Sequence, residues 1–310
     1  MLVLSEITLE NWDLENVDIV KIYGKDIQKH EGSEAEVIIC CRATARIVSE
    51  MNFPKLKLVQ LTSAGFDGVP IELYRQKGIY VANAGSVYSI PIAETVIYGM
   101  LQMAKRYHEN PQKHRIRIAR NYKYITELYG KTVTILGTGS IGGEIAKRLQ
   151  GFEMKTYGFS KSGRQKEYFA ENTNRLGRLK EMLGESQFVI STLPDQADLK
   201  GFINAELISC MKSDCVLLNV GRNMTINKRD LFRALKTRQI GGAVLDMFEK
   251  VPNPITNIFR RLSNTIVWPG VSAISREVSG RLEEHAKSNI LKTKKTEEPN
   301  CVVNGGTDAV

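Results

Sequence analysis

Two adjoining segments decide the fold of this chain: Lys131-Thr132-Val133-Thr134-Ile135-Leu136 and, directly after it, Gly137-Thr138-Gly139-Ser140-Ile141-Gly142. The first is rich in β-branched and apolar residues, which is typical of a buried strand. The residues from Gly143 to Gln150 place Ile145 and Leu149 on one face of a helix. The sequence therefore predicts a strand, a glycine-rich turn and a helix in immediate succession.

The three glycines of the turn have separate physical roles. Gly137 permits a tight turn, Gly139 lets the backbone approach a bound pyrophosphate, and Gly142 lets the helix lie close to the strand. The N–H groups of Ser140 and Ile141 at the start of the helix would then face the anion. We expect a dinucleotide-binding site here; the alternative is a glycine-rich turn that binds nothing.

Further apolar strands alternate with helical segments after this unit. They are predicted at 155–159, 188–193, 216–220 and 242–245. Such alternation indicates right-handed βαβ units and a doubly wound parallel sheet of the Rossmann type.

The first part of the chain, residues 1–95, reads as shorter β/α units. Its strands are predicted at 37–40, 56–61 and 79–81, and a long helix from Pro91 to Arg106 follows them. A final helix is predicted near the end of the chain, from about 275 to 291. We expect the polar tail, 292–310, to be loosely held.

The composition limits the classes of protein to consider. With 310 residues, 42% of them hydrophobic and 25% charged, the chain has the length and composition of two globular domains. It has no apolar run long enough to span a membrane and no signal peptide at its start, so we expect a cytoplasmic protein. The net charge of +9 favours anionic partners. The five cysteines form no zinc-ligand pattern, so no metal site is expected.

The residues after the strand at 155–159 bear on the choice of coenzyme. An Asp or Glu at this place would accept hydrogen bonds from an unphosphorylated ribose, but the chain has Ser160, Lys161 and Arg164 instead. The two cations would attract a 2′-phosphate, and two hydroxyls, of Ser160 and Ser162, could donate to it. We therefore expect NADP rather than NAD; a solvated basic turn that tolerates either coenzyme is the alternative.

Three further segments carry a family resemblance. They are Ser191-Thr192-Leu193-Pro194, the run Leu217-Leu218-Asn219-Val220-Gly221-Arg222, and the run Gly241-Gly242-Ala243-Val244-Leu245-Asp246-Met247-Phe248-Glu249. These segments follow the glycine turn in this order. Through the four features taken together, the chain resembles the D-isomer-specific 2-hydroxyacid dehydrogenase family over nearly its whole length.

The resemblance implies an architecture. A dinucleotide-binding domain, 96–272, would be inserted into a smaller, flavodoxin-like substrate domain made of 1–95 and 273–310, with the active site in the cleft between them. Most members of the family are homodimers. The implied substrate is a small 2-keto or 2-hydroxy acid.

The resemblance also assigns residues. Backbone N–H groups of Ala64 and Gly65 would hold the substrate carboxylate, and Asp246 would contact the nicotinamide. Arg222 follows an apolar strand, at the edge where α/β sheets bind ligands, and its fork can hold a carboxylate and polarise the carbonyl. The remaining coenzyme contacts implied are Leu193, Pro194, Val220 and Gly221.

The chain departs from the family at its acid pair. Gly270 stands where the family has a histidine after a proline, and Val251 stands where it has the partner glutamate. General acid catalysis is typically worth about 10²–10⁴-fold in rate, so efficient keto-acid reduction is not expected. The segments containing Tyr88, Lys250, Ser272 and Ser275 could supply another donor, whereas His285, far along the final helix, is expected to be a surface residue.

Two functions therefore remain open. One is an NAD(P)-dependent oxidoreductase with an altered proton donor. The other is a coenzyme-binding pseudoenzyme that acts as a sensor or binds a partner. We expect no nucleic acid as a partner, because the basic runs 113–120 and 292–295 lack interleaved aromatic residues, and we expect no membrane as a partner.

Overall fold

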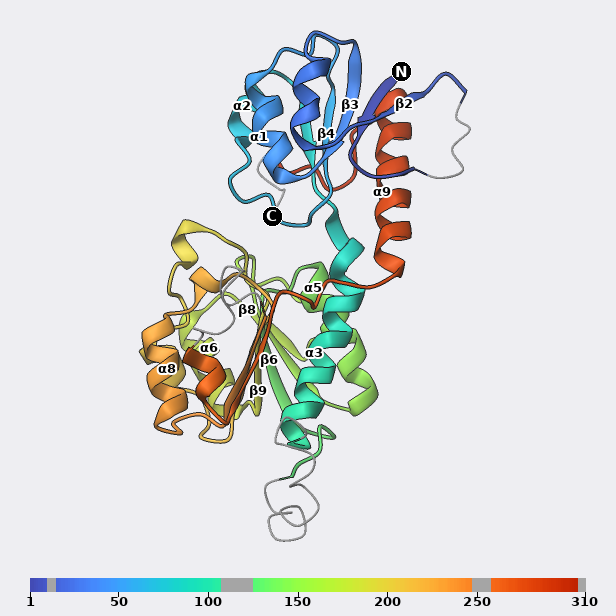
Figure 1. Ribbon diagram of the computed structural model, residues 1–310. Helices are drawn as coiled ribbons and strands as arrows, with labels where there is room; N and C mark the ends of the chain where they lie inside the picture. Colours follow the sequence, from blue (N-terminus) through green and yellow to red (C-terminus); the bar gives the residue numbers. More distant parts are fainter. Residues whose placement is uncertain (10–14, 107–124, 247–257, 306–310) are drawn as a thin grey trace. The chain divides into compact units, whose positions relative to one another are not determined.

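The computed structural model describes residues 1–9, 15–106, 125–246 and 258–305 (Figure 1). The chain divides into two compact units. Unit 1 contains Met1–Tyr88 and Ser275–Val310, and unit 2 is the continuous stretch Ser89–Ile274 between them. In the described part of the chain, every helix is too short or too polar to cross a membrane.

Unit 1 is built on a five-stranded parallel sheet with the order β2-β1-β3-β4-β5, which is the flavodoxin-like order. Its strands are β1 (Leu2–Ser5), β2 (Asp18–Lys21), β3 (Ala35–Cys40), β4 (Leu58–Leu61) and β5 (Tyr80–Ala82). Its α-helices are α1 (Arg42–Glu50), α2 (Ile71–Gln76) and α9 (Glu277–Lys294). One side of the sheet packs against a core that includes residues of α1, and the other side packs against Ala286 and Ile290 of α9.

Unit 2 contains a seven-stranded parallel sheet with the order β12-β11-β10-β9-β6-β7-β8. Its strands are β6 (Thr132–Leu136), β7 (Lys155–Phe159), β8 (Glu171–Thr173), β9 (Phe188–Ser191), β10 (Val216–Asn219), β11 (Gly242–Asp246) and β12 (Thr265–Trp268). Its α-helices are α3 (Ser89–Ala104), α5 (Ser140–Leu149), α6 (Leu176–Glu185), α7 (Ala205–Ser209) and α8 (Lys228–Lys236). The strand order turns back at β6, as in a Rossmann fold, so the predicted doubly wound fold is confirmed.

Short 3₁₀ turns complete the described elements. They are η1 (Gly24–His30), η2 (Gly85–Tyr88), η4 (Gln150–Phe152), η5 (Ala197–Leu199), η6 (Asn223–Thr225) and η7 (Ile258–Arg261).

Four strands were not predicted from the sequence: β1, β2, β8 and β12. Each is three or four residues long, and β2, β8 and β12 lie at sheet edges. Edge strands need not be apolar on both faces, so they carry a weak sequence signal.

The expectation of a loose C-terminal tail was wrong for its described part. Residues near 300 lie along the edge strand β5: Val303 N donates to Val81 O, and Asn83 N donates to Cys301 O. The side chain of Asn304, 8% exposed, accepts from Val81 N and donates to Ile79 O. The tail therefore supplies the hydrogen bonds that the edge of β5 would otherwise lack.

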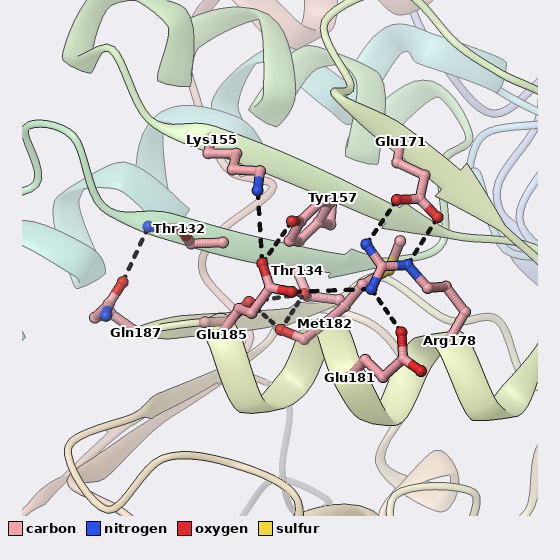
Figure 2. Close-up of polar contacts among 11 residues, drawn as sticks. Thr132, Thr134, Lys155, Tyr157, Glu171, Arg178, Glu181, Met182, Glu185 and Gln187 are labelled. Atoms are coloured by element: carbon pink, nitrogen blue, oxygen red, sulfur yellow. Dashed lines mark hydrogen bonds and ion pairs between the residues drawn. The ribbon is translucent and has the colours of Figure 1, made fainter.

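A network of charged side chains ties the short edge strand β8 to α6 (Figure 2). Arg178 of α6 holds both carboxylate oxygens of Glu171 in β8 at 2.9 and 2.7 Å and donates to Glu181 at 2.7 Å. Tyr157 of β7 donates to Glu185 at 2.6 Å, and the Arg178 guanidinium lies 5.5 Å from the centroid of its ring. The bidentate pair lowers the pKa of the Glu171 carboxyl.

Candidate functional site

The turn between β6 and α5 brings two backbones into close contact. Gly137 has φ = +96°, a conformation that favours glycine. A Cβ on Gly142 would lie 2.0 Å from the carbonyl oxygen of Gly137, and a Cβ on Gly137 would lie 2.5 Å from Thr192 Oγ1. Glycine at both positions lets the first turn of α5 pack directly on the end of β6.

The outer side of the same turn is open. Gly139 is exposed, and a Cβ added there would meet nothing within 4 Å. Gly139 is the N-cap of α5 and has no side chain that could accept a hydrogen bond, so among the described residues no cap side chain accepts from the N–H groups of Ser140 and Ile141 in the first turn. The positive end of the helix dipole adds to their attraction for an anion. We call residues 137–142 the cradle; its geometry fits a diphosphate.

The loops after β9 and β10 run together at the same edge of the sheet. The N–H groups of Val220 and Gly221 donate to Ser191 O at 3.1 and 3.0 Å, and Arg222 N donates to Leu193 O at 3.0 Å. A Cβ on Gly221 would lie 2.6 Å from Leu193 O, so only glycine allows this approach. Leu193 and Val220 are buried, whereas Pro194 is exposed.

Two buried polar side chains lie at these strand ends without an internal partner. Ser191 and Asn219 are register neighbours in β9 and β10, and both are 0% exposed. In the part of the chain that the structure describes, Ser191 Oγ and both polar atoms of the Asn219 side chain have no hydrogen-bond partner. Leaving such a group unpaired costs about 1–3 kcal/mol, so these atoms, like the open cradle, fit a site that takes up a polar ligand.

Arg222 lies in the loop after β10, as predicted, and is half-buried. Its carbonyl oxygen accepts the hydroxyl of Thr225 at 2.7 Å, which fixes the backbone on its C-terminal side. Because β6, β9 and β10 are neighbouring parallel strands, Arg222 and the cradle lie at the same, carboxyl edge of the unit 2 sheet.

Asp246 ends β11 and is 2% exposed. Its Oδ1 accepts the N–H groups of Gly270 and Val271 at 2.7 and 3.1 Å, and its Oδ2 accepts the N–H of Ser272 at 3.1 Å and the Ser272 hydroxyl. We call this arrangement the Asp246 clamp. A contact between Asp246 and a nicotinamide would have to replace one of these four bonds, and that contact stays a prediction.

Gly270, which the resemblance predicts to stand at the place of the family's histidine, has a left-handed backbone conformation. Gly270 has φ = +79°, in the left-handed region, and its N–H is used by the Asp246 clamp. An L-residue in that region costs about 1–2 kcal/mol. The predicted position of the partner glutamate, Val251, lies outside the described residues, as do Lys250, Glu249 and the basic run 113–120.

The predicted 2′-recognition residues lie between β7 and β8. Ser160 N donates to Thr173 O at 3.0 Å, and Gly163 N donates to Ser160 O at 3.1 Å, which closes a turn. Lys161 and Arg164 are exposed, and no carboxylate pairs with either of them among the residues described. We call residues 160–164 the basic turn.

Unit 1 contains the predicted carboxylate-binding turn. Asn83 Nδ2 donates to Ala64 O at 2.8 Å, and the Ser63 hydroxyl donates to Gly65 O at 2.7 Å. Ala84 N donates to Ser63 O at 3.0 Å. These bonds use the carbonyl oxygens of the turn and leave the N–H groups of Ala64 and Gly65 without an acceptor in the described residues.

Two of the alternative proton donors, Tyr88 and Ser272, have other partners, whereas Ser275 Oγ is buried without one among the described residues. The Tyr88 hydroxyl donates to Thr62 O, and burial raises the pKa of this tyrosine. Ser272 donates to Asp246. The expectation that His285 is a surface residue was wrong: its Nε2 lies 2.9 Å from Asn83 O, and partial burial lowers its pKa.

Sequence reasoning missed one residue beside the basic turn, Asn172. This residue lies within β8 and is 8% exposed. The strand Glu171–Thr173 has no apolar pattern, so the sequence offered no signal that its residues lie against the basic turn.

Comparisons with known proteins agree with this geometry. Residues 96–272 match the family model described as D-isomer specific 2-hydroxyacid dehydrogenase, NAD binding domain. The chain is 31% identical over 261 residues to a glyoxylate reductase of Pyrococcus horikoshii, covering 82% of this chain and 78% of the relative. It is 32% identical over 264 residues to a glyoxylate reductase of Pyrococcus furiosus, covering 82% and 77%.

A solved structure is similar over almost the whole chain. It is that of a D-isomer specific 2-hydroxyacid dehydrogenase family protein from Aeromonas salmonicida, with a TM-score of 0.81 and 27% identity, covering 97% of each chain.

Proposed function

Because this chain belongs to the D-isomer-specific 2-hydroxyacid dehydrogenase family, we propose that it is an NAD(P)-dependent oxidoreductase that interconverts a small 2-keto acid and the corresponding 2-hydroxy acid by a proton-transfer route of its own. The observation that supports this most strongly is the open cradle at α5 together with Arg222 at the same edge of the sheet. The glyoxylate reductases among its relatives make glyoxylate the first substrate to test.

The residues of this chain would divide the work as follows. The N–H groups of Ser140 and Ile141 bind the coenzyme diphosphate, and the bound nicotinamide supplies or accepts the hydride. Arg222 holds the substrate carboxylate in a bidentate pair and stabilises the negative charge that develops on the carbonyl oxygen. The N–H groups of Ala64 and Gly65 in unit 1 are donors of the kind that a carboxylate needs.

The proton completes the reaction. Reduction adds a hydride to the carbonyl carbon and a proton to the carbonyl oxygen. Gly270 has no side chain to give this proton, and its N–H already donates to Asp246. We infer that water supplies the proton and that turnover is therefore slow. The pH dependence of the turnover rate should show no step from the ionisation of a histidine near neutral pH.

We propose NADP as the preferred coenzyme, on the charge of the basic turn. Lys161 and Arg164 provide two exposed cations at the carboxyl end of β7, and no Asp or Glu lies within the turn to repel a 2′-phosphate. We also propose a homodimer, on the resemblance to the family; sedimentation of the purified chain tests the assembly state.

The Asp246 clamp favours a second candidate function. It uses the carboxylate of Asp246 and the loop at Gly270 for internal bonds, which holds this part of unit 2 in one arrangement without a proton donor. A chain with an intact cradle and no acid can bind a coenzyme without turning it over. Such a chain would act as a sensor of coenzyme or as a partner-binding protein.

One experiment separates the two candidates. NADPH and NADH absorbance is followed with glyoxylate, hydroxypyruvate and other 2-keto acids, and calorimetry measures the binding of each coenzyme. Turnover that is lost in Arg222→Ala, while coenzyme binding is kept, supports the oxidoreductase. Coenzyme binding without turnover across the panel refutes the oxidoreductase and leaves the sensor. No binding of either coenzyme refutes both.

A further inference from the structure

We propose that Asn172 is a positioning residue for coenzyme selectivity. Its buried amide would fasten the basic turn to the cradle, so that Lys161 and Arg164 are presented to the 2′-phosphate of NADPH. This inference rests on the proposed coenzyme binding and adds to it a residue that makes no direct contact with the coenzyme.

The hydrogen bonds of Asn172 join three separate pieces of chain. Its Nδ2, which carries two hydrogens, lies within hydrogen-bond distance of three acceptors: Thr138 Oγ1 of the cradle at 3.3 Å, Ser160 Oγ at the start of the basic turn at 3.0 Å, and the carbonyl oxygen of Arg164 at its end. The side chain is 8% exposed. Because the amide is buried, breaking these bonds leaves polar groups unpaired, so the arrangement is held firmly.

A missing side chain in β7 makes room for this amide. A Cβ on Gly158 would lie 2.7 Å from Asn172 Oδ1, 2.7 Å from Thr138 Cγ2 and 2.9 Å from the ring of Phe169. Glycine therefore lets the cradle, β7 and β8 close together around Asn172. This close approach is an independent observation that supports the position of the Asn172 amide between the cradle and the basic turn.

The strand that carries Asn172 is itself anchored on both sides. Gln165 Oε1 accepts Asn172 N at 3.1 Å, and the Glu171 carboxylate is held by Arg178 of α6 (Figure 2). The position of Asn172 is therefore set by the fold of unit 2. The hydrogen bonds of Asn172 in turn fix the position of the basic turn.

The basic turn has little other support. Apart from Asn172, its described bonds are the Ser160 N and Gly163 N backbone bonds and one from Arg164 N to Ser162 Oγ at 3.3 Å. The turn also contains a glycine, Gly163, whose φ is +61° and whose backbone is less restricted than that of any other residue of the turn. Without the Asn172 amide, we expect the basic turn to become more mobile. The side chains of Lys161 and Arg164 would then no longer be held in position to bind the 2′-phosphate.

The test measures coenzyme affinity rather than activity. Calorimetry gives the Kd of NADPH and of NADH for the full chain and for Asn172→Ala. NADPH binding is expected to weaken roughly tenfold, the value of about one charge-assisted hydrogen bond, while NADH changes less than about twofold, because the cradle remains. The pair 2′-phospho-ADP-ribose and ADP-ribose should show the same difference.

Two further variants separate positioning from a general loss of stability. Asn172→Asp keeps the shape but cannot donate to Arg164 O and adds a negative charge, so it should weaken NADPH more than alanine does. Asn227→Ala removes the side-chain N-cap of α8, elsewhere in unit 2, and should lower stability by about 1 kcal/mol without changing the ratio of the two affinities.

The outcomes bear on separate claims. If Asn172→Ala weakens NADPH and NADH equally, or weakens neither, Asn172 does not position the basic turn and the inference is refuted. If the unaltered chain binds both coenzymes with equal affinity, the inference is refuted while coenzyme binding stands. If it binds neither, the proposed function fails first. Thermal unfolding of each variant confirms that the protein measured is folded.

Discussion

Replacing Gly142 with alanine is expected to abolish coenzyme binding. A new Cβ would lie 2.0 Å from Gly137 O and 3.3 Å from Ile135 Cγ2. Since an ordinary contact between a carbon and another heavy atom is about 3.5 Å, the first turn of α5 and the end of β6 must separate by more than about 1 Å at this point. The closer neighbour cannot swing aside, because it is backbone.

The expected magnitude follows from that displacement. Overpacking of this kind costs about 1–3 kcal/mol of stability. A shift of about 1 Å also misplaces the N–H groups of Ser140 and Ile141; losing two charge-assisted hydrogen bonds, each about 1.5–3 kcal/mol, weakens binding by at least about 100-fold.

The next residue supplies a matched control. Gly143 is also helical, but a Cβ there meets nothing within 4 Å. Gly143→Ala should therefore keep coenzyme affinity and raise helix stability by about 0.5–1 kcal/mol. Calorimetry with NADH and NADPH and thermal unfolding measure both variants. If Gly142→Ala binds like the unaltered chain, or if Gly143→Ala loses affinity to the same degree, the close-approach argument is wrong.

The other expected outcomes concern stability and reactivity. Asp246→Ala removes the acceptor of the clamp and should lower the free energy of unfolding by about 3–5 kcal/mol in urea titrations; a loss below about 1 kcal/mol would contradict the clamp's structural role. Because Arg178 lowers the pKa of the Glu171 carboxyl in the folded chain, this pair stabilises above the unfolded carboxyl pKa of about 4.3 and its contribution is lost as the pH falls further. As the pH is lowered, the urea midpoint of Arg178→Gln should therefore fall less steeply than that of the unaltered chain. If the midpoints of both proteins fall equally steeply with pH, the pair does not contribute to stability. Cys41 is exposed, whereas burial raises the pKa of Cys215, so a thiol reagent should label Cys41 in the native chain and Cys215 only after unfolding; early labelling of Cys215 would contradict its burial.

The glycine turn is where local sequence was most informative. Its glycines are dictated by contacts a few residues away, such as Gly142 against Gly137, and these belong to one strand–turn–helix unit. The apolar strands of unit 2 were found for the same reason, because a strand buried on both faces reads as a continuous apolar run. Arg222 could be placed because it directly follows such a run.

Long-range contacts lay beyond the reach of the sequence. The bonds from Asn83 to Ala64 and from His285 to Asn83 join residues that are distant in the chain, and no local pattern marks them. The same holds for the tail near Asn304, whose polar residues suggested a loose end but which supply the hydrogen bonds that β5 needs.

The sequence by itself predicted a dinucleotide-type cradle and, through the family resemblance, Gly270 at the place of the family's histidine, since both predictions depend only on which residues follow which. The tertiary structure decided the use of Asp246 and Asn172. Each is a polar group buried beside a turn from another part of the chain, and its partners are set by how strands pack side by side. A buried polar group must find its partners in three dimensions, so its role becomes visible only when the fold is known.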